Sequence, residues 1–186
     1  MSKKLLKPTT ALSPVPAVMV SCCNEAGEKN IITIAWVGTL CSEPPMIGIG
    51  IRKSRFSYHM IEETGEFVVN LPSESLTWAT DFCGVNSGRN VDKFGELELN
   101  PVAGEEVKAP LIDECPVNIE CKVKDIIELG SHDLFVGQVV AVHAEDDLLD
   151  DKGRFRIEDA DLIAYGRSTY WSIGEALGES GFSKKS

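Results

Sequence analysis

Short runs of apolar and β-branched residues, separated by turn residues, dominate this chain. Runs of this kind predict β-strands, because a buried strand reads as a short apolar segment bounded by Gly, Pro, Asn or Asp. The sequence predicts strands at 17–22, 31–37, 46–51, 66–71, 117–127, 134–144 and 162–165. In the third of these, Gly48 and Gly50 alternate with large residues, a pattern that often marks close approach by another backbone or a ligand.

Two segments follow helical spacing instead. Phe56, Met60 and Ile61 share one face of a helix predicted over 54–64. A shorter helix is predicted over 75–82, where the following Gly84 ends it.

Residues 84–110 contain Gly, Asn and Pro with few periodic apolar positions, which predicts a long loop of the kind that is often functional. Six or seven strands with two short helices between them favour a mainly β fold, a closed or half-closed β-barrel. The strands and helices do not alternate and no G-x-G-x-x-G follows a strand, so a doubly wound nucleotide-binding fold is not expected. We expect a single domain over 1–186, with 1–12 and 174–186 as extended arms or tails.

Charge narrows the range of partners. The chain carries 29 acidic and 18 basic residues, a formal net charge of −11. Nucleic acid and anionic membrane surfaces are therefore not expected as partners, because both need clustered Lys and Arg. The basic N-terminus has no apolar run long enough for a signal peptide, and nothing approaches the length of a membrane helix, so we expect a cytoplasmic protein.

The six cysteines form no C-x-x-C pair, which leaves zinc and iron–sulfur sites without support. A domain of this size does not need disulfide bonds, and we expect mostly buried free thiols. Cys83 differs from the others because it lies in a Gly-rich segment.

Four segments carry candidate chemistry. Along 30–36, Thr33 and the strand backbone could line a flat ligand, although a plain strand with Trp36 in the core is the simpler interpretation of this segment taken alone. Between a strand and a helix start, 52–59 brings together three cations and two hydroxyls. This combination suits an anion site, or else forms a solvated basic turn.

The third segment, 83–94, is rich in small residues that allow a backbone to approach a ligand closely, with Ser87, Arg89 and Lys93 available for a phosphate. It lacks the Walker A order, and a flexible loop is the alternative. The fourth segment contains His132 at a turn, where histidine is more often structural than catalytic. No neighbouring residues complete a hydrolase triad with it.

In this order, the segments resemble the flavin reductase-like, FMN-binding split-barrel family, which includes the flavoredoxins. The resemblance covers about residues 10–172 and is carried by Pro14-Val15-Pro16, 30–36, Pro44-Pro45, 52–58, 65–70, 87–94, Glu120-Cys121 and 132–137, with Tyr165-Gly166-Arg167 and Tyr170 similar to the family's tail. It implies a Greek-key split β-barrel and a homodimer with two FMN sites near the subunit interface.

The resemblance also implies roles for individual residues. It implies that the isoalloxazine ring is bordered by Thr33, Ile34, Ala35 and Trp36, and that the phosphate or ribityl chain is held by Arg52, Ser54 and Ser57. The residues that would close over the cofactor are Cys83, Gly84, Ser87, Asp92, Lys93 and Phe94. One departure concerns the start of the first helix, where many relatives have Thr and this chain has Phe56-Ser57.

The implied function is an oxidoreductase that passes electrons from a reduced nicotinamide or a protein donor through FMN to flavin or another acceptor. A non-catalytic flavoredoxin-type carrier is the first alternative, and a relative that has lost its cofactor is the second. Because the cofactor carries the chemistry, no side chain is expected to be catalytic and no metal is expected.

Overall fold

The computed structural model describes residues 1–184. The elements run in the order β1 (Val15–Pro16), β2 (Val18–Cys23), β3 (Lys29–Ile34), β4 (Val37–Ser42), β5 (Pro45–Ile51), α1 (Phe56–Thr64), β6 (Glu66–Leu71), η1 (Glu74–Leu76), α2 (Thr77–Val85), α3 (Lys93–Glu96), β7 (Pro101–Val102), β8 (Leu111–Ile112), β9 (Val117–Glu128), β10 (Asp133–Ala144), η2 (Asp146–Leu148), η3 (Ile157–Asp159), β11 (Ile163–Gly166) and β12 (Thr169–Ser172).

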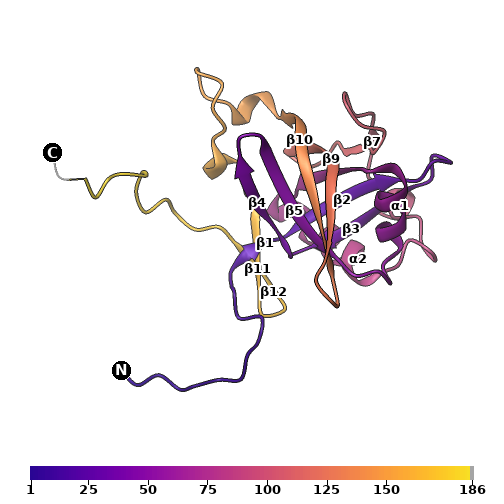
Figure 1. Ribbon diagram of the computed structural model, residues 1–186. Coiled ribbons are helices and arrows are strands. Elements are labelled where there is room, and N and C mark those ends of the chain that lie inside the picture. The colour runs from indigo at the N-terminus through magenta and orange to yellow at the C-terminus, as the bar shows by residue number, and fades with distance from the viewer. Residues whose placement is uncertain (185–186) are drawn as a thin grey trace.

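Seven antiparallel strands form the main sheet in the order β3-β2-β6-β9-β10-β5-β4. The sheet curls, because β3 and β5 approach each other although four strands lie between them in that order. The predicted split β-barrel is confirmed (Figure 1). Its interior is filled by the apolar faces of β2, β3, β5, β6, β9 and β10 together with Tyr58, Met60 and Ile61 of α1.

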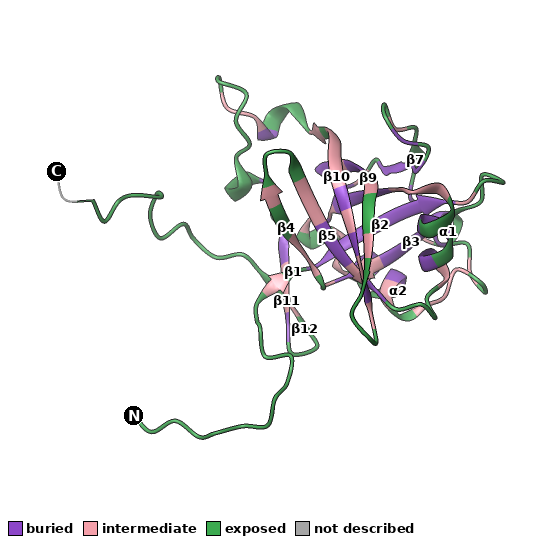
Figure 2. Cartoon of the chain, viewed as in Figure 1, coloured by how far each residue is buried: buried purple, intermediate pink, exposed green. Residues whose placement is uncertain are grey.

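The helices lie at one side of the barrel, where α1 packs on β2 and α2 packs on β3. Figure 2 shows the buried residues concentrated along these strands. Helix α1 ends at Gly65, whose φ of 68° is the left-handed conformation that glycine adopts at low cost. Strand β6 begins at the next residue, so the C-terminal end of α1 is fixed beside the sheet.

A second, smaller sheet joins the two ends of the chain in the order β1-β11-β12. Val15 pairs with Tyr165, and Tyr165 pairs in turn with Tyr170. Residues 1–14 and 173–184 contain no helix or strand and are exposed, and Figure 1 shows the outer ends of both segments leading away from the barrel. The last two residues of the predicted 174–186 tail lie outside the described range.

Several predicted boundaries were wrong. The strand predicted at 31–37 ends at Ile34, and a separate strand, β4, follows it. Helix α1 begins at Phe56 rather than Ser54, α2 runs on to Val85, and the predicted loop 84–110 contains α3 and β7. By contrast, the alternating glycines of β5 do mark close approach: a Cβ on Gly48 would lie 2.8 Å from Leu40 Cδ1, and the Gly50 N–H donates to the Trp36 carbonyl of the neighbouring segment at 2.7 Å.

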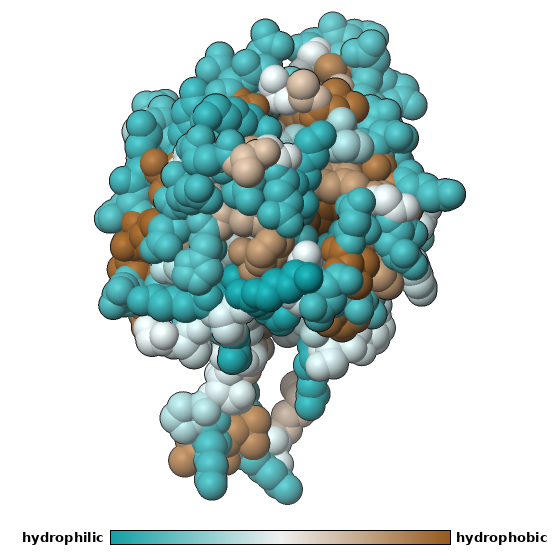
Figure 3. Space-filling model, turned by 90° about the vertical axis from the view of Figure 1, so that its right-hand side faces the viewer, coloured by the Kyte–Doolittle hydropathy of each residue, from teal (hydrophilic) through white to brown (hydrophobic). Residues whose placement is uncertain are grey.

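No helix within residues 1–184 combines the length and the apolar character needed to cross a membrane. The face in Figure 3 is largely hydrophilic, with separate apolar patches.

Candidate functional site

Two adjoining cavities lie between the barrel, the helices and the two ends of the chain. The larger has a volume of about 890 Å³ and the smaller about 450 Å³. Ile32, Arg52 and Arg55 line both cavities, so the two form one continuous site with two compartments.

The smaller cavity is polar. Its walls come from the β5–α1 turn and from the segment that follows α2, and they present the hydroxyls of Ser54, Ser57 and Ser87. The guanidinium of Arg89 crosses between the two walls: its Nη1 donates to the Ser54 carbonyl at 3.1 Å and its Cζ lies 5.5 Å from the centre of the Phe56 ring.

Close approach of these walls depends on Gly88. A Cβ at this position would lie 2.3 Å from Asn30 Oδ1 and 2.7 Å from Phe56 Cδ1, well inside contact distance. Asn30 is itself fixed, because it is buried and its amide donates to the Ser57 hydroxyl at 2.8 Å. The sequence therefore needs a residue without a side chain here for the segment to close on the cavity.

The arginines of the two compartments have no acidic partners. Within residues 1–184, Arg52, Arg55 and Arg89 form no salt bridge, although the chain has 29 acidic residues. Three unpaired guanidinium groups, with serine hydroxyls between them, form a site for an anion that accepts several hydrogen bonds.

Lys93 is placed differently from these arginines. Its side chain is buried, and its Nζ donates to the carbonyls of Ile31 and Cys83 at 2.5 and 2.7 Å. Burial lowers the pKa of this ammonium, while the nearby Cys83 and Cys22 thiols oppose the shift. Lys93 thus ties α3 to β3 and α2 at the back of the smaller cavity, with two of its donors already used inside the protein.

Cys83 also lies at the back of the smaller cavity, fully buried. Burial raises the pKa of its thiol to about 11, and the Lys93 ammonium offsets this only in part. A thiol with so high a pKa is protonated at neutral pH and is a poor nucleophile.

The larger cavity has an apolar wall from β3 and the residues that follow it. Ile34, Ala35 and Trp36 lie along this wall beside Thr33. The Thr33 hydroxyl donates to the Thr80 carbonyl of α2. A Cβ on Gly84 would lie 3.2 Å from Thr33 Cβ, so helix and strand are packed closely here.

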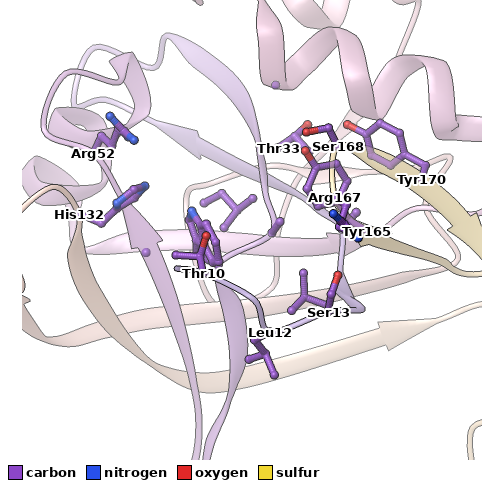
Figure 4. Close-up of a pocket in the computed structure, with 18 of the residues that line it drawn as sticks. Thr10, Leu12, Ser13, Thr33, Arg52, His132, Tyr165, Arg167, Ser168 and Tyr170 are labelled. Carbon is purple, nitrogen blue, oxygen red and sulfur yellow. The ribbon is translucent and has the colours of Figure 1, made fainter. Parts of the chain in front are cut away.

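His132, from the β9–β10 turn, stands at one end of the larger cavity with its ring edge-on to Trp36, the ring centres 6.1 Å apart. Burial, and then the charges of Arg52 and Arg55, lower the pKa of His132, so the imidazole is neutral at neutral pH. The opposite end is formed by the N-terminal arm and the β11–β12 turn, as Figure 4 shows for Ser13 and Arg167.

Most of the residues singled out from the sequence meet at these cavities. The larger is lined by Thr33, Ile34, Ala35, Trp36, Arg52 and Gly84, and the smaller by Arg52, Ser54, Ser57, Cys83, Ser87 and Lys93. Within the described part of the chain, Asp92 and Phe94 line neither cavity: Asp92 precedes α3, and Phe94 packs in a core with Met19 and Ile31.

The lining residues of the two chain ends were missing from that set. They are Leu6, Thr9, Thr10, Ala11, Leu12, Ser13, Tyr165, Gly166, Arg167, Ser168 and Tyr170. The sequence signal that pointed to them was the tail segment around Tyr165-Gly166-Arg167, but no local pattern indicates that β1 pairs with β11 and brings the two ends together.

Known proteins share this architecture. The chain matches the flavin reductase like domain over residues 11–168. It is 34% identical to the flavoredoxin of Desulfovibrio vulgaris (Miyazaki F), covering 99% of this chain and 100% of that one with a TM-score of 0.93. For a flavoredoxin from Methanosarcina acetivorans the identity is 31%, the coverage 98% and 97%, and the TM-score 0.90.

An FMN-binding protein from Thermus thermophilus, solved with bound 1-cyclohex-2-enone, is 26% identical, with coverage of 96% and 99% and a TM-score of 0.80. The domain match spans most of the chain, and both flavoredoxins are similar to it over nearly its full length. The chain therefore belongs to the flavin reductase-like family.

Proposed function

We propose that this protein binds FMN across the two compartments and passes electrons through it, from a reduced nicotinamide or a protein donor to flavin or another acceptor. Family membership supports the coarser function, flavin-binding redox chemistry. The single observation that carries the choice of FMN is the set of three unpaired arginines around a hydroxyl-lined cavity, next to a cavity with an apolar wall.

The smaller compartment fits the phosphate of FMN. Arg52 and Arg89, with the hydroxyls of Ser54, Ser57 and Ser87, would hold a dianion through charge-assisted hydrogen bonds. Gly88 keeps this compartment narrow, because the absence of a Cβ lets its segment approach Asn30 and Phe56 closely. Riboflavin lacks the phosphate and would leave these arginines unpaired.

The larger compartment fits a flat heteroaromatic ring. Ile34, Ala35 and Trp36 offer an apolar surface. Strand β3 is an edge strand that pairs only with β2, so backbone groups on its outer side can bond the polar edge of such a ring. Gly84 lets α2 pack closely against Thr33, and a larger residue at this position would move the helix or intrude into the cavity.

Bound FMN supplies the redox chemistry, accepting and releasing electrons and protons at its ring. The protein's contribution is to orient the cofactor, to neutralise its phosphate and to exclude water from the apolar wall. His132 is neutral at the rim, so it can donate or accept a hydrogen bond there without adding charge. The proposal needs no catalytic side chain.

The alternative from a different class is a non-catalytic carrier in which bound FMN exchanges electrons only with partner proteins. The similarity to two flavoredoxins is the observation that favours this alternative. Turnover of NADH or NADPH by the purified protein separates the two functions, since a carrier would give none.

The experiment that tests the cofactor is a titration of the protein with FMN and riboflavin, followed by flavin fluorescence. We expect FMN to bind at least about tenfold more tightly, since one charge-assisted hydrogen bond contributes roughly 1.5–3 kcal/mol. Arg89→Ala should lower the affinity for FMN and leave the affinity for riboflavin unchanged. Arg154→Ala, which removes an exposed arginine paired with Asp150, should change neither affinity.

Equal affinities for the two flavins would contradict the phosphate site. A protein that shows no flavin absorption after purification and takes up neither flavin would match the second alternative, a relative without its cofactor.

We further propose a homodimer in the cytoplasm. Trp78 and Val85 on α2 are 69% and 70% exposed, and Val85 lines the larger cavity; exposed apolar side chains of this size are commonly covered by a second subunit. All six cysteines are free, as is usual in a reducing compartment.

A further inference from the structure

The larger cavity contains a cation that the FMN proposal does not use. Arg167 lies in the two-residue turn between β11 and β12, and its side chain lines this cavity but not the smaller one. In Figure 4, Arg167, Ser168 and Tyr170 lie on one side, whereas Arg52 and His132 lie on the other, with Thr10 between them.

The turn that presents Arg167 is held in place. Arg167 and Ser168 have φ values of 52° and 62°, as a tight type I′ hairpin requires of both central residues. Asn and Gly are the usual residues there, because larger side chains are strained in the left-handed region. Here an arginine and a serine occupy both positions at the rim of a cavity.

Neighbouring contacts anchor this hairpin to the rest of the site. The Tyr170 hydroxyl donates to Asp81 Oδ1 of α2 at 3.2 Å, and Trp171 Nε1 donates to the Gly166 carbonyl at 3.4 Å. A Cβ on Gly166 would lie 2.4 Å from Ser13 Oγ, so the N-terminal arm is packed closely against the turn. The backbone of Arg167 therefore has a fixed place relative to α2 and the arm.

The charge around Arg167 is unbalanced. Within residues 1–184 its guanidinium has no ion pair and no hydrogen bond. The lining of the larger cavity includes three arginines and only one carboxylate, that of Asp81, which already accepts from Tyr170. In a chain with a net charge of −11, the cavity is a local excess of positive charge.

We propose that Arg167 recognises an oxyanion on the substrate that meets the cofactor in the larger cavity, and so determines which electron donors and acceptors are accepted. This inference rests on the proposed function. The oxyanion is a phosphate of the donor or an acidic group of the acceptor, and in both cases the guanidinium offers paired donors to it. Arg167 selects the substrate and takes no part in the electron transfer.

The test compares charged and uncharged substrates in the FMN-loaded protein. The donors are NADH and N-benzyl-1,4-dihydronicotinamide, which has no phosphate. The acceptors are naphthoquinone sulfonate and uncharged menadione, used after reduction of the protein by dithionite, so that this arm does not need a nicotinamide donor.

The informative variant is Arg167→Gly, because glycine suits the left-handed backbone and the variant should fold at least as well as the parent. If Arg167 recognises the donor, we expect KM to rise about tenfold for NADH; if it recognises the acceptor, we expect the same rise for naphthoquinone sulfonate. A tenfold change is the scale of one lost charge-assisted hydrogen bond. We expect kcat to stay the same and the uncharged counterpart to be unaffected. Arg167→Lys should restore part of the loss, and Arg154→Gly, which removes an exposed arginine that lines neither cavity, should leave KM unchanged.

Two further readouts separate this inference from the proposed function. The affinity for FMN should be the same in Arg167→Gly as in the parent, and calorimetry should show weaker binding of oxidised dinucleotide or of the quinone sulfonate to the variant. If both charged substrates keep their KM, or if charged and uncharged substrates lose equally, the assignment is wrong. A loss of FMN affinity would place Arg167 in the cofactor site and would also overturn it. A parent protein that binds no FMN would instead refute the proposed function.

Discussion

At the scale of single residues, the site depends on which cationic side chains already have hydrogen-bond partners inside the protein and which are free to bind a ligand. Lys93 has a charge close to the smaller cavity, yet two carbonyls bind its ammonium. Arg52 and Arg55 are free of acidic partners within the described residues. The sequence shows all three as equivalent cations, because nothing local reveals that Lys93 points into the protein.

Cys83 provides a prediction at this scale. We expect Cys83→Ala to retain FMN and most electron transfer, since burial raises the pKa of the thiol to about 11 and keeps it unreactive. Cys83→Trp should expel the cofactor by filling the back of the smaller cavity. Flavin fluorescence measures the first property and reduction by several donors the second. An alanine variant that holds FMN but accepts electrons from no donor would show that the thiol takes part in the chemistry.

A second prediction concerns Glu120, a fully buried carboxylate on β9. It accepts backbone N–H groups of Glu105, Glu106 and Val107 at 2.8–2.9 Å and lies 2.5 Å from His143 Nε2. Removing one partner of a buried pair typically costs about 3 kcal/mol, so Glu120→Ala should lower the free energy of unfolding by roughly that amount in urea titrations at neutral pH.

The pH dependence of this contribution has a definite sign. Burial alone would raise the pKa of Glu120, but its backbone donors and His143 together hold it below the ordinary value of 4.5. The stabilisation is therefore complete above that value and is lost as the pH falls through the lower pKa of the folded state. The difference between the parent and Glu120→Gln should shrink as the pH falls through this range. A difference that grew on acidification would contradict the assignment.

At the scale of elements, the sequence predicted the buried strands of the barrel well and the exposed edge strand poorly. Strand β6 was predicted with its exact bounds, because Gly65 and Pro72 mark both ends of an apolar run. Strand β4 was missed, since it is an edge strand with exposed residues and no apolar alternation. The fold and the β3 wall of the larger cavity could be predicted from the sequence. The end of that cavity formed by the N-terminal arm and the β11–β12 turn could not, because it depends on pairing between the distant strands β1 and β11.

The segment after α2 gives the prediction at this scale. We expect Gly88→Ala to lower the affinity for FMN at least about tenfold, because a Cβ would clash with Asn30 and Phe56 and push the segment away from the smaller compartment. The matched control is Gly38→Ala, where nothing lies within 4 Å of the new Cβ and the backbone does not have a positive φ. If both variants bind FMN like the parent, closure of this segment does not shape the site.

At the scale of the whole molecule, exposed apolar side chains give a prediction about assembly. We expect sedimentation to give twice the 20.3 kDa mass of one chain at micromolar concentration, because covering Trp78 and Val85 removes apolar surface from water. Trp78→Glu should shift the equilibrium toward the single chain, and Val142→Glu, at a similarly exposed position on β10, should not. A parent protein that sediments as one chain would contradict the proposed dimer.

The small sheet that pairs β1 with β11 has a consequence for the order in which the molecule folds. Strand β1 precedes all seven strands of the barrel along the chain, and its partner β11 follows all of them. The barrel strands can pair with one another without β11, but the N-terminal arm and the β11–β12 turn, which close one end of the larger cavity, cannot come together until β11 has been synthesised. A chain truncated after residue 162 should therefore contain a folded barrel whose cofactor pocket is open to solvent at that end.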